Sequence, residues 1–303
     1  MSYVLVLALR VTSRSPITMP NTLTYNASDQ IQITASSFGS ADGRPVLLLH
    51  GAGQTRHAWN RTAVALAAEG WHAVALDARG HGDSAWCPGG DYSIEQFISD
   101  LKYVVMLVTD ECGYPPAVVG ASLGGITALL AQGEEERSLF SALVLVDITP
   151  RLDSGGVARI LKFMRDHQQG FASLQEAADA VASYQSHRVR QAKSADGLRK
   201  NLRLVDGRYY WHWDPKLLEH VARLDVEIVN RQRLAAKNLS LPVQLVHGQM
   251  SDIVSDESAR DFLRLVPHAS YVNVSNAAHM VAGDDNDVFA AAVSKFLQEN
   301  IDV

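Results

Sequence analysis

Six short apolar runs, spread along the chain, constrain the fold more than any other feature of this sequence. They cover residues 46–49, 73–76, 117–119, 142–146, 243–246 and 271–274, and each is bounded by Gly, Pro or Asp or by a polar loop. Because nearly every position within a run is apolar, both faces of such a strand would be buried. Strands buried on both faces are typical of a parallel sheet covered by helices.

Segments with the period of amphipathic helices separate these runs. They cover residues 59–68, 94–108, 123–132, 258–265 and 288–298. Before them, residues 21–25 and 31–36 alternate between apolar and polar side chains, which predicts a leading antiparallel hairpin. Strands that alternate with helices predict an α/β fold, with a mostly parallel sheet and helices on both faces.

The region from residue 151 to residue 240 breaks this rhythm, because it contains no clear buried-strand run. Its pattern is helical and polar, with candidate helices over residues 155–167, 174–185, 198–204 and 215–224. Gly170, Gly197 and Gly207 separate these candidates. We therefore predict a helical cap inserted into the chain. The predicted domains are an N-terminal extension (1–20), a main domain (21–150 and 241–303) and the cap (151–240).

Composition narrows the classes of function. The chain has 27 Lys and Arg against 33 Asp and Glu, which gives a net charge of −6. A nucleic-acid binder would typically carry an excess of basic residues, and this chain does not. The apolar run at residues 3–9 is far shorter than the roughly 20 residues that span a bilayer, and no basic segment precedes it. Cys87 and Cys112 have no metal-site spacing. We expect a soluble cytoplasmic protein that binds neither nucleic acid nor membrane.

The strongest local motif is Gly120-Ala121-Ser122-Leu123-Gly124. This G-x-S-x-G pattern follows a predicted strand and opens a predicted helix, which is the setting of a nucleophile elbow. In such a turn the small neighbours remove clashes, and the serine hydroxyl stands exposed above the sheet. Ser122 is therefore the candidate nucleophile, and a plain glycine-rich turn is the alternative.

A serine nucleophile needs a base, and the base needs a carboxylate that orients it. His279 follows the last predicted strand, and Asp252 follows the strand at residues 243–246. All three groups then lie beyond the carboxyl ends of strands, where open parallel sheets bind ligands. Asp147, after the strand at residues 142–146, is the other position that could supply the acid.

The loop after the first parallel strand supplies a candidate oxyanion hole. It reads His50-Gly51-Ala52-Gly53, and its small residues let the backbone approach a substrate oxygen. The Ala52 N–H can then act together with the Leu123 N–H. Gly51 and Gly53 are predicted to border the substrate, and His50 to fix the loop.

Five motifs, in this order, resemble the α/β-hydrolase superfamily over residues 21–303. They are HGAG at 50–53, LDARGHGDS at 76–84, VVGASLGG at 118–125, GQMSDIV at 248–254 and NAAHM at 276–280. The chain resembles the cap-carrying branch, which includes esterases, cofactor-free haloperoxidases and C–C bond hydrolases, and the triad order Ser, Asp, His agrees with it. The resemblance implies a cap between the sixth and seventh strands and structural roles for Asp77, Arg79 and Asp83.

The type of nucleophile separates the branches of this superfamily. Epoxide hydrolases and haloalkane dehalogenases carry Asp at the elbow, whereas Ser122 suits acyl transfer through an acyl-enzyme. C–C bond hydrolases usually have Asn before the serine, where this chain has Ala121, and haloperoxidase-like proteins typically have Met after it, where this chain has Leu123. We predict a hydrolase of carboxylic esters, lactones or thioesters that needs neither a metal nor an organic cofactor.

Three alternatives stay open. A C–C bond hydrolase of a diketone and a cofactor-free haloperoxidase or perhydrolase resemble the chain in the same motifs. A receptor on the same fold would bind a small molecule without turning it over, because fold alone does not fix function. The complete set of triad residues favours an enzyme.

The cap carries a dense aromatic stretch, in a chain that is only 7% aromatic. Tyr209, Tyr210, Trp211 and Trp213 are predicted to line a pocket for a small, apolar ester, since ligand sites are mostly hydrophobic. The alternative is a packed core that holds the cap to the main domain. Trp59, after the oxyanion loop, has the same two interpretations: a wall of the pocket, or a part of the core.

Overall fold

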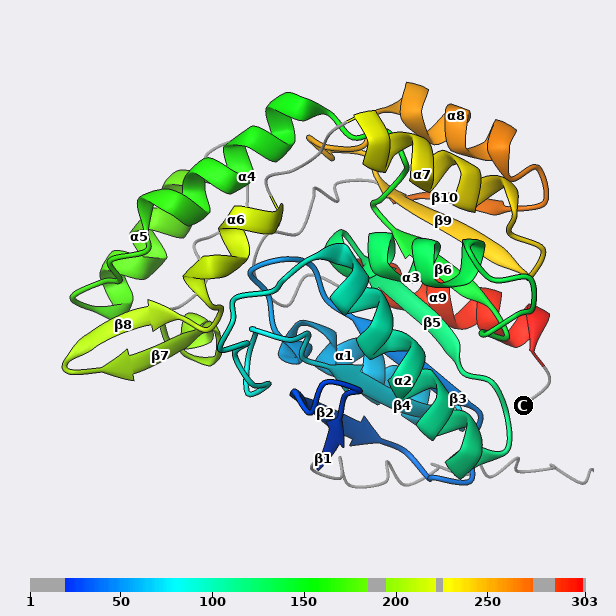
Figure 1. Ribbon diagram of the computed structural model, residues 1–303, viewed down its shortest axis with the longest axis horizontal. Coiled ribbons are helices and arrows are strands. Elements are labelled where there is room, and N and C mark those ends of the chain that lie inside the picture. Colours follow the sequence, from blue (N-terminus) through cyan, green and yellow to red (C-terminus); the bar gives the residue numbers. More distant parts are fainter. Residues whose placement is uncertain (1–19, 185–194, 222–225, 275–286, 302–303) are drawn as a thin grey trace, which may run out of the picture.

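An eight-stranded sheet forms the centre of the protein (Figure 1). The computed structural model describes residues 20–184, 195–221, 226–274 and 287–301. In spatial order the strands are β1 (Asn21–Asn26), β2 (Gln32–Phe38), β4 (His72–Leu76), β3 (Pro45–Leu49), β5 (Ala117–Ala121), β6 (Leu143–Val146), β9 (Val243–Gly248) and β10 (Ser270–Val274). The pairs β1–β2 and β2–β4 are antiparallel, and all other pairs are parallel. The predicted mostly parallel α/β fold with a leading hairpin is confirmed.

Helices cover both faces of this sheet. One face packs against α2 (Ile94–Cys112), α3 (Leu123–Gly133), α7 (Val226–Lys237) and α8 (Asp256–Leu265), and the other against α1 (Asn60–Ala68) and α9 (Asp287–Asn300). Successive side chains of a strand point to opposite faces. Leu47 therefore joins the core of the first face, and its neighbour Leu48 joins the core of the second. This burial explains the continuous apolar runs, except in β10, which lies at the sheet edge and is partly exposed.

The cap follows β6. It contains α4 (Ser154–Asp166), α5 (Leu174–Tyr184), the 3-10 turn η2 (Ala195–Asn201), β7 (Leu202–Val205), β8 (Arg208–Trp211), the 3-10 turn η3 (Pro215–Leu217) and α6 (Leu218–Val221). The prediction of one helix over residues 198–204 was wrong: residues 198–201 belong to the 3-10 turn η2, and residues 202–204 belong to β7, which pairs with β8 in an antiparallel hairpin. Asp206 and Gly207 join these strands with positive φ angles of 48° and 78°. Asp-Gly is the signal for such a two-residue turn.

Helix α7 packs on the main domain. No predicted helix covered it, and the prediction extended the cap to residue 240. In the structure Ala235 and Ala236 are buried in the core beside α3. A Cβ on Gly133, at the end of α3, would lie 2.3 Å from the Ala235 carbonyl oxygen, so glycine permits the close approach of the two helices. The structure therefore groups α7 with the helices of the main domain.

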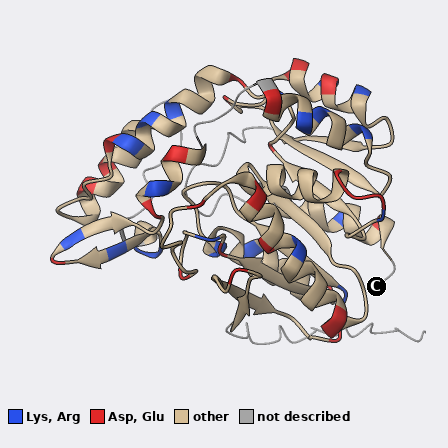
Figure 2. Ribbon diagram, in the orientation of Figure 1, with Lys and Arg blue, Asp and Glu red and all other residues tan. Residues whose placement is uncertain are grey.

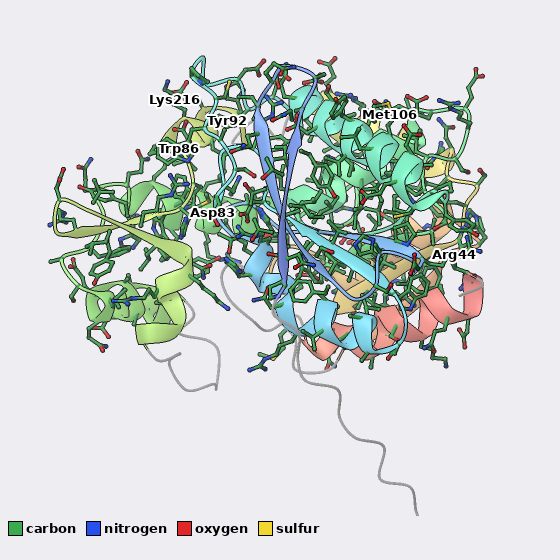
Figure 3. The ribbon with its side chains drawn as sticks, turned by 90° about the horizontal axis from the view of Figure 1, so that it is seen from below. Arg44, Asp83, Trp86, Tyr92, Met106 and Lys216 are labelled. Carbon is green, nitrogen blue, oxygen red and sulfur yellow. The ribbon has the colours of Figure 1, made fainter. Side chains whose placement is uncertain are left out.

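Polar contacts join the cap to the main domain. The Tyr92 hydroxyl donates to Asp214 Oδ2 (2.7 Å) and accepts from the Cys87 N–H (2.8 Å). Burial and the Asp214 carboxylate raise the pKa of Tyr92, which keeps this hydroxyl a donor. Lys216 Nζ donates to the Pro88 carbonyl (3.2 Å). Tyr92 and Lys216 lie together at this junction (Figure 3). Asp214 and Lys216, at the start of η3, are thus bonded to the loop that precedes α2.

The surface carries charged residues of both signs. Figure 2 shows Lys and Arg interspersed with Asp and Glu along the helices of the cap and of the main domain. Several of them pair within one helix, as Lys162 and Asp166 do on α4 (2.5 Å). Of the helices that the structure describes, none combines the length and the apolar character needed to cross a membrane.

A buried ion pair organises the loop after β4. Asp77 accepts hydrogen bonds from the backbone N–H groups of Arg56 (2.6 Å) and Asp83 (2.9 Å), and it pairs with the Arg56 guanidinium. Arg56 also pairs with Asp83 (2.8 Å). Two residues on, Arg79 makes a bidentate pair with Asp100, at 2.6 Å for both bonds. The contacts of Asp77, Arg79 and Asp83 are those of residues that shape a loop.

Asp77→Ala should lower the free energy of unfolding by about 3–5 kcal/mol, because it leaves the Arg56 charge buried without its central partner. Urea unfolding followed by circular dichroism measures this change. The matched control is Lys162→Ala, which removes one partner of an exposed pair and should cost less than about 1 kcal/mol. Equal losses in the two variants would contradict the structural role of Asp77.

Candidate active site

Ser122 lies in a strained turn between β5 and α3. Its backbone has φ 49° and ψ −117°, a conformation that side chains rarely adopt. A Cβ on Gly120 would lie 2.6 Å from the Gly124 carbonyl oxygen, so the turn closes only with glycine there. The strand, the strained turn and the helix follow one another as expected for a nucleophile elbow. The role of Ser122 stays a prediction.

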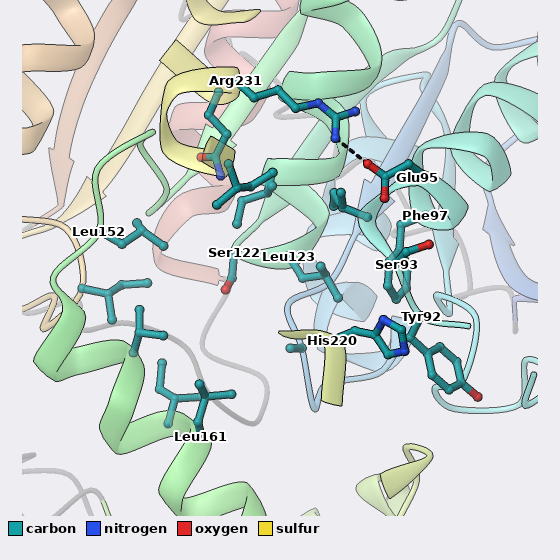
Figure 4. Close-up of a pocket in the computed structure, with 18 of the residues that line it drawn as sticks. Tyr92, Ser93, Glu95, Phe97, Ser122, Leu123, Leu152, Leu161, His220 and Arg231 are labelled. Atoms are coloured by element: carbon teal, nitrogen blue, oxygen red, sulfur yellow. Dashed lines mark hydrogen bonds and ion pairs between the residues drawn. The ribbon is translucent and has the colours of Figure 1, made fainter. Parts of the chain in front are cut away.

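A cavity of about 350 Å³ opens beside Ser122. Ser122, Leu123 and Ala52 line it. Apolar side chains on the other side of Ser122, among them Leu152 and Leu161, form a wall (Figure 4). Its size falls within the range of small-molecule sites, about 300–1,000 Å³, and its walls are mostly apolar as in such sites. The structure thus brings together the predicted nucleophile and both predicted oxyanion residues.

The oxyanion loop has its own hydrogen-bond network. The Gly51 N–H donates to Gln54 Oε1 (3.1 Å), and the Gly53 N–H donates to His81 Nε2 (3.2 Å). Ala52, between these two engaged amides, borders the cavity. A Cβ on Gly51 would lie 3.1 Å from Ser122 Cβ, so this glycine keeps the loop close to the nucleophile. The loop is therefore held in place by Gln54 and His81.

Two buried histidines support this loop from behind. Nδ1 of His50 lies 2.8 Å from the Gly51 carbonyl oxygen, and its Nε2 faces the Ala78 N–H. Nδ1 of His81 lies 3.0 Å from the Arg79 carbonyl oxygen, and its Nε2 faces the Gly53 N–H. Nδ1 therefore carries the proton and Nε2 accepts. Burial lowers the pKa of His50 to about 4 and of His81 to about 3, so both rings are neutral at pH 7. The predicted loop-fixing role of His50 fits this arrangement.

The predicted base, His279, lies outside the described residues. Of the two candidate acids, Asp252 is exposed, and its Oδ2 pairs with Arg159 Nη2 on α4 (3.2 Å). Asp147 is buried at the end of β6, with a φ of 51°. Its Oδ1 accepts from the Gly248 N–H (3.2 Å) and its Oδ2 from the Ser251 hydroxyl (2.7 Å). The turn after β9 is thus organised around Asp147.

The predicted aromatic lining lies away from the described cavity wall. Trp59 is fully buried in the core between the sheet and α1. Trp211 and Trp213 are buried in an aromatic core, with Tyr209 packed against it. Tyr210 lines a second hollow, which Trp211 and Trp213 also border and which does not include Ser122. Gly53 lies near the aromatic core, since a Cβ there would be 3.7 Å from Trp213 Nε1. The alternative interpretation, a packed core that holds the cap to the main domain, fits these positions, because Tyr92 and Phe97 of the main domain belong to the same core.

The sequence analysis missed the residues that α4 and α7 contribute to the cavity. From α4 these are Val157, Ile160, Leu161 and Met164. They recur at intervals of three and four residues, which places them on one helical face. This spacing could have predicted from the sequence that one apolar face of α4 is buried or lines a cavity. From α7 the lining includes Ile228 and Arg231, and no sequence pattern marked these residues.

Sequence comparison agrees with this architecture. The family model of the alpha/beta hydrolase fold matches residues 44–285, which is most of the chain. The chain therefore belongs to the α/β-hydrolase fold family.

Several relatives have names that concern ester hydrolysis. Esterase Rv0045c of Mycobacterium tuberculosis (strain ATCC 25618 / H37Rv) is 30% identical over 265 residues, which cover 83% of this chain and 82% of that protein. The sn-1-specific diacylglycerol lipase ABHD11 of Mus musculus is 28% identical over 284 residues, 92% of this chain and 86% of the lipase. A crystal structure of the mycobacterial esterase superposes with a TM-score of 0.71 at 27% identity, over 93% of each chain.

A further solved structure shares the fold alone. E-2-(acetamidomethylene)succinate hydrolase superposes with a TM-score of 0.78 over 92% of this chain and 99% of its own, at 20% identity. At that identity the likeness extends to the architecture and not to the substrate.

Stability should fall as the pH falls from 7 to 5. In this range the unfolded chain protonates its histidines near pH 6.5, whereas folded His81, with a pKa of about 3, stays neutral. The free energy of unfolding therefore decreases as the pH falls, and His81 alone accounts for a decrease of about 2 kcal/mol at pH 5. His81→Gln, which keeps an acceptor for Gly53, should reduce the loss by about that amount in urea unfolding at the two pH values. An unchanged pH dependence in this variant would contradict the neutral, buried His81.

Proposed function

We propose that this protein is a serine hydrolase of carboxylic esters, with lactones and thioesters as related substrates. The observation that carries the proposal is Ser122 in its strained turn, at the floor of a cavity that Ala52 and Leu123 also line. Strained backbone at a site facing a cavity is typical of a catalytic nucleophile. The relatives named as an esterase and a lipase support the same reaction class.

The proposed reaction runs through an acyl-enzyme. Ser122 Oγ attacks the ester carbonyl while His279 takes its proton, and the amides of Ala52 and Leu123 stabilise the oxyanion. The intermediate collapses, His279 returns the proton to the leaving alcohol, and the acyl group stays on Ser122. Water, deprotonated by His279, then attacks the acyl-enzyme carbonyl. As this second intermediate collapses, the bond to Ser122 Oγ breaks, His279 returns the proton to Ser122 Oγ, and the carboxylic acid is released. In this proposal no metal or organic cofactor takes part.

For the acid that orients His279, the described geometry favours Asp147 over the sequence-based choice, Asp252. A triad carboxylate is held in place by hydrogen bonds and shielded from water. Asp147 is buried and accepts two hydrogen bonds, from Gly248 and Ser251, whereas Asp252 is exposed and pairs with Arg159. Asp147 follows β6 and Asp252 follows β9, so both lie beyond the carboxyl ends of parallel strands. Either residue could therefore supply the acid in this fold.

The proposed substrate is a small, neutral ester with an apolar part. Leu152, Ile160 and Ile253 are typical of the cavity wall, and they offer no hydrogen bonds. Among the described lining residues the charged side chains are Glu95, Glu227 and Arg231, and Arg231 is already paired with Glu95. A carboxylate on the substrate would find no unpaired cation in this part of the lining, so a neutral ester fits better.

Ser122→Ala should lower kcat for hydrolysis of p-nitrophenyl butyrate by about four to six orders of magnitude, because no other group in the proposed mechanism forms the acyl-enzyme. Release of p-nitrophenol measures the rate. The matched control is Ser99→Ala on α2, which removes a hydroxyl that bonds to Ser28 (3.1 Å) outside the cavity and should leave the rate unchanged. Full activity of Ser122→Ala would exclude the proposed nucleophile.

Asp147→Asn should lower kcat by about four orders of magnitude, the loss seen when an orienting carboxylate is replaced in a comparable triad. Asp252→Asn is the matched control and should stay within several-fold of the wild-type rate. Melting curves of both variants check that the fold is kept. The opposite pattern, in which Asp252→Asn loses activity and Asp147→Asn keeps it, would restore Asp252 as the acid.

A further inference from the structure

Arg231 stands at one end of the cavity, next to Glu95 (Figure 4), and it pairs with two carboxylates. Its Nη1 donates to Glu95 Oε1, on the first turn of α2, at 2.5 Å. Its Nε and Nη2 donate to the two carboxylate oxygens of Glu134, just after α3, at 2.5 and 3.0 Å. A bidentate pair of this kind fixes the plane of the guanidinium group. Arg231 is thus held in one orientation from two sides.

Arg231 also borders a second hollow, on the outer surface between the end of α3 and α7. Glu134, Asn230 and Leu234 line that hollow, together with Glu227 and Arg231. The last two residues also line the cavity beside the nucleophile. The guanidinium group and its stem therefore separate the cavity from the outer hollow, where the exposed Leu234 provides apolar surface.

We propose that Arg231, held between Glu95 and Glu134, is the end wall of the substrate cavity and sets the longest apolar chain that the protein accepts. The proposal rests on the ester hydrolase function proposed above. An apolar chain that extends from Ser122 along Ile228 meets this paired guanidinium group. To pass, it would have to displace charge-assisted hydrogen bonds to both carboxylates, and an apolar chain offers no polar group in exchange.

Helix α7 keeps its place without this side chain. Ala235 and Ala236 are buried against α3, and Asn238 Nδ2 donates to the Gly133 carbonyl (3.0 Å). Shortening Arg231 therefore removes the wall and leaves the helix attached. We expect the cavity then to extend past Glu227, the other residue that lines both spaces, toward the outer hollow and Leu234.

The test compares wild type with Arg231→Ala on p-nitrophenyl esters from butyrate to dodecanoate, and on acetates of the corresponding alcohols. In at least one of the two series, the ratio of kcat/KM for the longest chain to that for the shortest should rise at least about tenfold, since each newly covered methylene favours binding by about fourfold. The matched control is Lys102→Ala, which breaks the pair between α2 and Glu135 (2.6 Å) outside the cavity and should leave the ratio unchanged.

An unchanged ratio in both series for a folded Arg231→Ala protein would overturn the proposal. If that variant fails to fold, Arg231→Gln shortens the same wall and should raise the ratio in the same direction, and no rise would overturn the proposal equally. Calorimetric binding of methyl alkyl ketones of increasing length to Ser122→Ala, with and without Arg231→Ala, needs no catalysis. It therefore separates failure of the wall from failure of the hydrolase function.

Discussion

The turn at Ser122 is the constraint on which the rest of the site depends. Its conformation costs of the order of 1–3 kcal/mol, and it persists only because the surroundings leave the chain no alternative. A Cβ on Gly124 would meet Leu49 Cβ at 2.6 Å, and one on Gly125 would meet Ile148 Cγ2 at 2.5 Å. Leu49 of β3 and Ile148, which follows β6, therefore pack against the elbow from both sides. The central strands thus keep the Ser122 hydroxyl at the cavity.

The parallel sheet places the other groups around that hydroxyl. Ala52 follows β3, Asp147 follows β6, and the turn that contacts Asp147 follows β9, so all of them lie beyond the same edge of the sheet. The cap then covers this edge with the apolar face of α4. Neutral histidines behind the oxyanion loop fix its backbone without adding charge. The site combines a rigid polar floor with an apolar roof, which suits the binding of an uncharged carbonyl compound.

The central strands and the elbow could be predicted from the sequence because their signals are local. Leu48 and its neighbours form an apolar run since both sheet faces are covered, and Gly120 and Gly124 mark a turn that only glycine allows. Helix α7 carried no such signal, because its buried face consists mainly of small residues such as Ala235. The choice between Asp147 and Asp252 as the acid depends on how deeply each is buried and on contacts between distant parts of the sequence. The spacing of residues in the sequence does not reveal either property.

The central claim, that Ser122 is an activated nucleophile, is tested most directly by a fluorophosphonate, which phosphorylates an active serine and releases fluoride. Intact-mass and peptide mass spectrometry locate the adduct. The account predicts one adduct, on Ser122, that forms in the native protein and is absent after denaturation or in Ser122→Ala. A native, folded protein that forms no adduct at Ser122, or forms it elsewhere, would contradict the account and favour a non-catalytic binding protein on this fold.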